Sequence, residues 1–184
     1  AGRSKTVLRF TAPAEVKGIA LLVVNHPDRA SDQWMWTPSI GRERRIALQD
    51  RSTRFFGTDF SFEDLEERDV DQADYSLLGE ENIAGVACFK LEAKPKKASQ
   101  YTRSVLWIRK DLYVLAQVES FKNEALIRRI KQSDVATVQN IATPRRIEVL
   151  DAKRNSTTVL TIEKLTYDLP LAEDAFTLQA LRRE

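Results

Sequence analysis

Apolar residues recur at every second position in many short segments of this chain. This alternation is typical of strands that bury one face. The segments are also rich in β-branched and aromatic residues, which fit a pleated, half-buried surface. They predict about ten strands, within residues 7–10, 19–24, 33–36, 44–48, 75–78, 86–93, 104–108, 113–120, 125–131, 146–150 and 157–167.

Turn-forming dipeptides separate several of the predicted strands. Four of them are Ala84-Gly85, Lys110-Asp111, Lys122-Asn123 and Arg154-Asn155. Connections this short cannot hold a crossover helix, so neighbouring strands are predicted to be antiparallel. A sheet of about ten strands curls, closes or splits into two layers. We expect one strongly curved antiparallel sheet.

Helix signals are few. Residues 60–68 read FSFEDLEER, in which Ser61 is a candidate cap and Phe62 and Leu65 fall on one helical face. We expect this segment to be a helix against the concave face of the sheet. A second short helix is predicted over residues 171–176, and a single turn over residues 13–17.

Composition is that of a globular protein, with 42% hydrophobic and 30% charged residues in a chain of 184. This length favours a single domain over residues 1–184. The net charge of +2 does not favour a nucleic-acid partner. The longest uninterrupted apolar run covers residues 19–24, far shorter than the roughly 20 residues of a membrane helix. The chain is therefore predicted not to span a membrane.

The residues that commonly carry catalysis are scarce. His26 and Cys88 are the only histidine and cysteine. They offer too few ligands for a zinc site, so we predict no bound metal and no role for either residue in turnover. Nucleotide-binding, hydrolase and metalloprotease motifs are missing from the sequence. Cys88 is best interpreted as a buried small hydrophobe.

Two charged stretches allow more than one interpretation. The acidic residues between Asp59 and Asp74 are interpreted as a solvated helix face, with a calcium site or a carboxylate pair as alternatives. The basic residues Arg42, Arg44 and Arg45 precede two further arginines. They either pair with the acidic stretch or bind phosphate or lipid headgroups.

The order of motifs resembles that of a known family. Residues 10–22 resemble an F-x-x-P-x-x-x-x-G strand lead, and residues 32–38 a D-x-W-x-Y-x-P motif in which Trp36 replaces the tyrosine. An R-R-I motif follows at residues 44–46, and residues 56–65 are similar to F-x-G-S-D-F-S-Y-E-D-L. The chain is thereby identified as a member of the outer-membrane lipoprotein-sorting family, the LolA-like group.

This resemblance implies a mainly β fold, an open and strongly curved antiparallel β-barrel in which short helices form a lid over an apolar cavity. It implies a non-enzymatic periplasmic carrier of a lipidated or lipidic ligand that needs no cofactor. The implied partners are the acyl chain of a lipoprotein or another lipid, and an inner- or outer-membrane protein. An envelope sensor or an exporter-associated interaction protein with the same fold is the alternative. Compared with the family, the chain is expected to lack the signal peptide, a helix and the first strand or strands.

Strand alternation and the lid prediction together indicate a ligand surface. Leu8 and Phe10 share one face while Arg9 is expected to point to solvent, and Trp34 and Trp36 share a face. Within residues 19–24 both faces are apolar, so the choice of Leu21 and Val23 is close to even. A filled core would use the same residue types, and the sequence does not separate the two. The predicted cavity residues are Leu8, Phe10, Leu21, Val23, Trp34, Trp36, Ile46, Phe60, Phe62 and Leu65.

Overall fold

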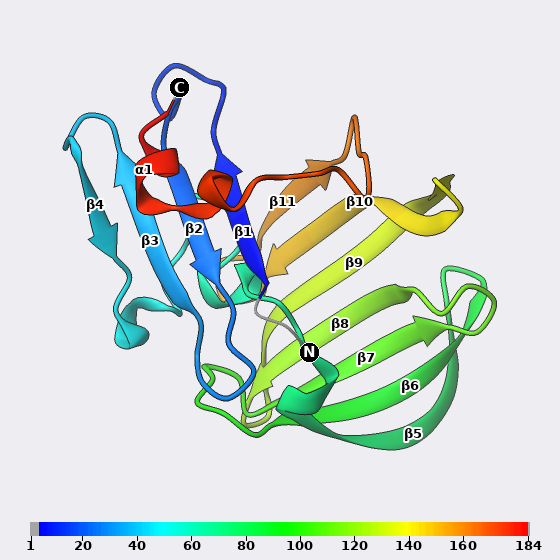
Figure 1. Ribbon diagram of the computed structural model, residues 1–184. Coiled ribbons are helices and arrows are strands. Elements are labelled where there is room, and N and C mark those ends of the chain that lie inside the picture. Colours follow the sequence, from blue (N-terminus) through cyan, green and yellow to red (C-terminus); the bar gives the residue numbers. More distant parts are fainter. Residues whose placement is uncertain (1–3, 184) are drawn as a thin grey trace. The chain divides into compact units, whose positions relative to one another are not determined.

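The computed structural model describes residues 4–183, which form eleven strands in two antiparallel sheets (Figure 1). The first sheet has the order β1-β2-β3-β4 and contains β1 (Lys5–Arg9), β2 (Ala20–Val24), β3 (Asp32–Thr37) and β4 (Arg42–Arg45). The second has the order β11-β10-β9-β8-β7-β6-β5 and contains β5 (Ala73–Ile83), β6 (Val86–Pro95), β7 (Arg103–Arg109), β8 (Leu115–Lys122), β9 (Ala125–Val138), β10 (Ile141–Asp151) and β11 (Ser156–Thr161). The predicted mainly β, antiparallel fold is confirmed.

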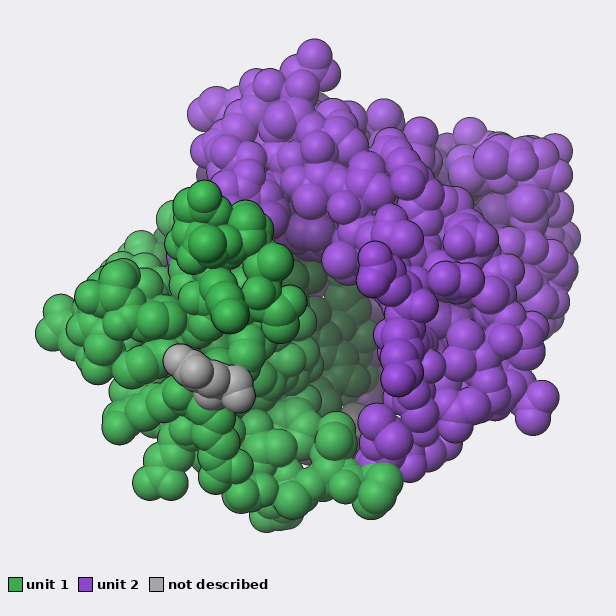
Figure 2. Space-filling view, turned by 90° about the horizontal axis from the view of Figure 1, so that it is seen from above, with its two compact units in different colours: residues 1–53, 62–69, 170–184 green, residues 54–61, 70–169 purple. Residues whose placement is uncertain are grey.

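The chain divides into two compact units, coloured separately in Figure 2. Unit 1 comprises residues 1–53, 62–69 and 170–184, and unit 2 comprises residues 54–61 and 70–169. The expectation of one continuous sheet is wrong. Within residues 46–72 the chain forms 3-10 turns and loops, and no strand described here links β4 to β5. Whether the two units are one domain stays a prediction.

The helix predicted over residues 60–68 is wrong in extent. Only a single 3-10 turn forms, η2 (Glu63–Leu65), and the backbone of Glu66 is already extended. Four acidic side chains within five residues (63–67) repel one another on a helix. The Glu66 carboxylate instead accepts two hydrogen bonds from Arg51, each 2.7 Å long. The ion pair with Arg51 therefore favours the extended backbone of Glu66, which helix propensity alone did not predict.

The other short elements flank the sheets. Two 3-10 turns, η1 (Leu48–Asp50) and η3 (Val70–Gln72), lie between β4 and β5. Near the C-terminus, η4 (Glu173–Phe176) overlaps the helix predicted over residues 171–176. It is followed by α1 (Leu178–Leu181), whose N-cap Thr177 accepts a hydrogen bond from the Ala180 backbone.

In unit 1, α1 covers one face of the four-stranded sheet (Figure 1). Leu181 is fully buried against Ala20 and Leu22, and Phe176 packs beside it. The opposite face is buried at Leu21 and Val23, and Gln33 there donates hydrogen bonds to the Phe62 carbonyl and the Glu66 carboxylate. Residues 62–69 are thus fixed to this second face by a buried side-chain amide.

Near the end of β2 in unit 1, three side chains surround a nearly buried carboxylate. Asp32 lies 2.9 Å from His26 Nε2 and accepts hydrogen bonds from Arg29 at 2.6 Å and Arg45 at 2.5 Å. The hydrogen bond from Arg29 outweighs the effect of burial and, with those from Arg45 and His26, holds the pKa of Asp32 well below its usual range. His26 is therefore part of a structural ion-pair network.

A buried cluster on one side of the seven-stranded sheet is centred on Trp107. Its ring is buried with Cys88, Val105 and Ala116. The indole N–H donates to the Glu81 carboxylate at 3.1 Å, so the only polar atom of the ring is satisfied. Cys88 is fully buried, as predicted, and burial raises the pKa of its thiol.

We predict that Asp32→Asn lowers the free energy of unfolding by about 1–3 kcal/mol at pH 7, because charged hydrogen bonds are lost. The folded-state pKa of Asp32 is depressed. Its contribution is therefore present above the unfolded pKa of about 3.9 and is lost as the pH falls toward the folded value. Urea unfolding should show wild type and variant converging at low pH. The exposed Asp28→Asn is the control, and equal stability of all three proteins at pH 7 would refute the assignment.

Cys88 should resist alkylation in the folded protein, because its thiol is buried and its thiolate is disfavoured. Iodoacetamide at pH 8 is expected to leave native protein unmodified over an hour and to label it fully in denaturant, as measured by intact mass. Rapid labelling without denaturant would contradict the buried placement.

Candidate functional site

A row of aliphatic side chains crosses the seven-stranded sheet from edge to edge. The strand register places these residues directly opposite one another, so they point to the same side. The members of the row, one from each of β5 to β10, are Leu77, Leu91, Leu106, Val118, Ile130 and Val149. On β11 the row ends at Thr158, which pairs with Val149.

A second apolar row runs beside the first. Phe89, Ile108 and Leu115 are paired across β6, β7 and β8, and Ile147 and Leu160 are paired across β10 and β11. We call the two rows together the apolar face. Leu77 and Leu160 keep 65% and 45% of their surface exposed at the two edges, and most other members are half-buried, whereas Val118 and Val149 are fully buried. The apolar face is therefore open to a ligand in part.

The opposite side of the same strands has a different character, and we call it the charged face. Its residues alternate with those of the apolar face and include Lys90, Glu119 and Arg129. Ion pairs of 2.7 Å join Lys90 to Glu81 and Arg129 to Glu119. The charged face thus combines these ion pairs with the buried Trp107 cluster, whereas the two rows of the apolar face contain no charged side chain.

The loop 54–61 is fixed at the β11 edge of the sheet by Asp59. The Asp59 backbone N–H donates to Thr158 Oγ1, and its carboxylate accepts hydrogen bonds from the hydroxyls of Ser156 and Thr158. Burial favours the neutral acid, but these hydroxyls with Arg54 lower the pKa of Asp59, so it stays ionised. Asp59 is therefore an anchor for the loop, and its geometry does not indicate a catalytic acid.

The ten predicted cavity residues are not brought together on one surface. By register, Leu8, Phe10, Leu21, Val23 and Ile46 lie on the β1–β4 face that residues 62–69 cover. Leu21 and Val23 are fully buried, and Phe62 is 4% exposed. Leu65 is in the turn η2, whereas Phe60 belongs to unit 2.

Trp34 and Trp36 share a face, as predicted, but it is the opposite one. They pair with Leu22 and Ala20 and pack in the cluster around Leu181. Arginine side chains cover both rings, Arg45 at 5.9 Å from Trp34 and Arg182 at 5.8 Å from Trp36.

The prediction that Arg9 points to solvent is wrong. Arg9 lies on the face of the two tryptophans and donates to the carbonyls of Ala180 at 2.7 Å and Leu181 at 3.0 Å. Those carbonyls lie at the C-terminal end of α1, where a cation is stabilising. Strand alternation alone did not predict this contact, because its acceptors belong to the C-terminal segment.

The sequence analysis did not single out the apolar face of unit 2. A signal was present, because Phe89 and Leu91 alternate with Lys90 and Glu92 in one strand. The concentration of aromatic residues between 34 and 62 directed the prediction elsewhere.

The charged stretches are largely paired. Arg51 binds Glu66 and Arg54 binds Asp59, which confirms the pairing interpretation for these two arginines, while Arg45 binds Asp32. Within residues 4–183, no group of three or more His, Cys, Asp or Glu side chains is arranged to hold a metal ion. No helix in that range is long and apolar enough to cross a membrane.

Comparisons with known proteins agree with the resemblance found in the sequence. A family model described as "-like: Uncharacterized protein" matches residues 2–183. No protein with a curated description matches the sequence. Among solved structures, a LolA superfamily protein from Nitrosomonas europaea is 21% identical with a TM-score of 0.71, covering 96% of this chain and 77% of its own, and shows the fold alone.

Two further structures are more similar. A putative outer membrane lipoprotein-sorting protein domain from Vibrio parahaemolyticus is 27% identical, with a TM-score of 0.94 over 98% of this chain and 78% of that one. A DUF1329 family protein from Desulfovibrio piger is 32% identical, with a TM-score of 0.94 over 97% of this chain and 77% of that one. The chain therefore belongs to the DUF1329 family, and it shares its fold with the LolA superfamily protein and with the putative lipoprotein-sorting domain.

Proposed function

We propose that this protein is a non-enzymatic carrier of a lipidic ligand, either the acyl chain of a lipoprotein or another lipid. The observation that carries the proposal is the apolar face, in which a row of aliphatic side chains crosses six strands and most members of the face stay partly exposed. A surface of this kind binds apolar chains without any reacting group.

The energetics of such binding are favourable. Each buried CH₂ contributes about 0.8 kcal/mol, so an acyl chain with roughly ten buried CH₂ groups gains about 8 kcal/mol before the cost of association. Transfer to a partner then requires only a second apolar site of somewhat greater affinity. A carrier therefore needs no covalent step.

The buried placement of the two most reactive side chains supports a non-enzymatic role. His26 is held in the Asp32 network of unit 1, and Cys88 is enclosed in the Trp107 cluster of unit 2. The contacts described above give each of these side chains a structural role.

We further propose that the protein acts in the periplasm, with an inner- or outer-membrane protein as donor or acceptor of the ligand. The support is the similarity to a putative outer membrane lipoprotein-sorting domain. An acyl chain leaving one membrane for another must be shielded from the water between them, and an apolar face meets that need.

We predict that wild type binds a fluorescent fatty-acid analogue saturably and that Leu106→Asn weakens binding about tenfold or more. Leu106 lies at the centre of the apolar face and is half-buried, so the change removes apolar contact with the chain. Fluorescence titration measures affinity, and thermal melts of the same samples show whether the variant is folded.

A matched pair on β11 provides the control. Leu160 lies on the apolar face and Val159 on the charged face, with exposed fractions of 45% and 44%. Leu160→Asn should weaken binding severalfold and Val159→Asn should not. Trp36→Ala tests the surface predicted from sequence. If only this variant loses affinity while remaining folded, the ligand binds at the tryptophans and the proposed face is wrong.

A further inference from the structure

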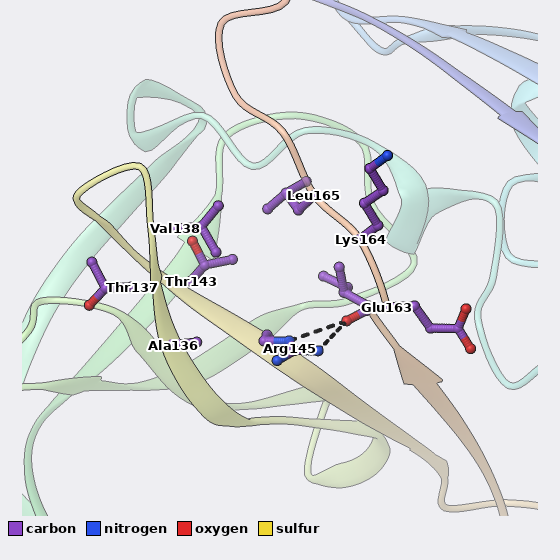
Figure 3. A pocket seen from close by; sticks show the side chains of 9 residues that line it. Ala136, Thr137, Val138, Thr143, Arg145, Glu163, Lys164 and Leu165 are labelled. Atoms are coloured by element: carbon purple, nitrogen blue, oxygen red, sulfur yellow. Dashed lines mark hydrogen bonds between the residues drawn. The ribbon is translucent and has the colours of Figure 1, made fainter.

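An open cleft of about 320 Å³ lies where residues 162–165 cross the far part of the β9–β10 hairpin (Figure 3). Its apolar lining includes Ala136, Val138 and Leu165, and Figure 3 shows Val138 and Leu165 pointing toward the same space. Its polar lining includes Thr143 and Arg145. All of these residues belong to unit 2.

The wall of the cleft is held in place by hydrogen bonds around Tyr167. Its hydroxyl lies 2.7 Å from Thr143 Oγ1, and Thr143 is 4% exposed. The Tyr167 backbone N–H donates to Gln139 Oε1 at 2.6 Å, and the Tyr167 carbonyl accepts from Gln139 Nε2 at 3.3 Å. The segment that follows β11 is therefore fixed across the hairpin, and the cleft is formed before any ligand arrives.

Arg145 is a cation in this cleft whose partner is a neutral carbonyl. Its Nε and Nη2 both donate to the Ile162 carbonyl at 3.3 Å. Among residues 4–183, no carboxylate forms an ion pair with it, and the Glu163 side chain points away from it in Figure 3. A half-buried guanidinium normally pairs with an anion, and its planar fork fits a carboxylate or phosphate.

The cleft continues the apolar face. Strand alternation places Arg145 on the same side of β10 as Ile147 and Val149, two and four residues further along. At about 3.3 Å per residue, the guanidinium-bearing position lies roughly 13 Å from the central row. An apolar surface that ends at a cation without an anionic partner matches an amphiphile with a chain and a charged head.

We propose that Arg145 binds the anionic head group, a carboxylate or a phosphate, of an amphiphile whose chain lies on the apolar face. This inference rests on the proposed function and names the class of its ligand. Arg145 then determines specificity, and the aliphatic rows supply most of the affinity.

The test compares three competitors that share a sixteen-carbon chain, namely palmitate, hexadecyl phosphate and hexadecanol, in displacing the fluorescent fatty-acid analogue below their micelle concentrations. Wild type should bind at least one anionic competitor about tenfold more tightly than the neutral alcohol. The ranking of palmitate and hexadecyl phosphate identifies the head group. Arg145→Met should abolish the preference and leave hexadecanol affinity unchanged, and Arg145→Lys should retain part of it.

The neighbouring Arg146 provides a control with the same charge change. It lies on the charged face and pairs with Glu148 at 3.5 Å, so Arg146→Met should keep the preference of wild type. Equal binding of all three competitors to wild type, or a preference that survives in folded Arg145→Met, overturns the role of Arg145 while the carrier function stands. Failure of every competitor and of the fluorescent analogue overturns the carrier function itself.

Discussion

The register of the seven-stranded sheet is the constraint on which the rest of the site depends. Because side chains alternate across a strand, a shift of one residue in any pairing would move a leucine from the apolar face to the charged face. Six consecutive strands keep the alignment despite irregularities between Leu77 and Gly79 and at Trp107. Short hairpin turns fix it locally, and the ion pairs of the charged face favour the same alignment.

An apolar face that stays partly open contributes less to stability than a closed core, so other contacts must hold the fold. In unit 2 the buried Trp107 cluster stabilises the charged side of the sheet, and Asp59 fastens the loop 54–61 to β11. In unit 1 the sheet is covered on one side by α1 and on the other by residues 62–69. Each cover is attached through a buried polar contact, which fixes its position more sharply than apolar packing alone.

The sequence predicted what is local and missed what is long-range. Every predicted strand segment overlaps one of the eleven strands, because period-two alternation and turn residues act within a few positions. The break between two sheets, the contact of Arg9 with the C-terminal helix and the extended Glu66 each depend on partners from fifteen to more than 170 residues away. The helix over residues 60–68 and the exposure of Arg9 were therefore predicted wrongly, because the local sequence does not show these distant partners.

The same limitation applies to the aromatic residues from which the sequence analysis predicted a cavity. Trp34 and Trp36 have large apolar rings, but their planes are occupied by Arg45, Arg182 and the C-terminal segment, so they serve chiefly to attach that segment to the sheet. The aliphatic side chains of unit 2 are individually unremarkable in sequence and acquire meaning only when six strands align them. A flexible acyl chain has no preferred planar partner, and a row of leucine, isoleucine and valine side chains matches it along its length by area alone. Ligand recognition by such a surface is a property of strand register, which single-residue chemistry does not reveal.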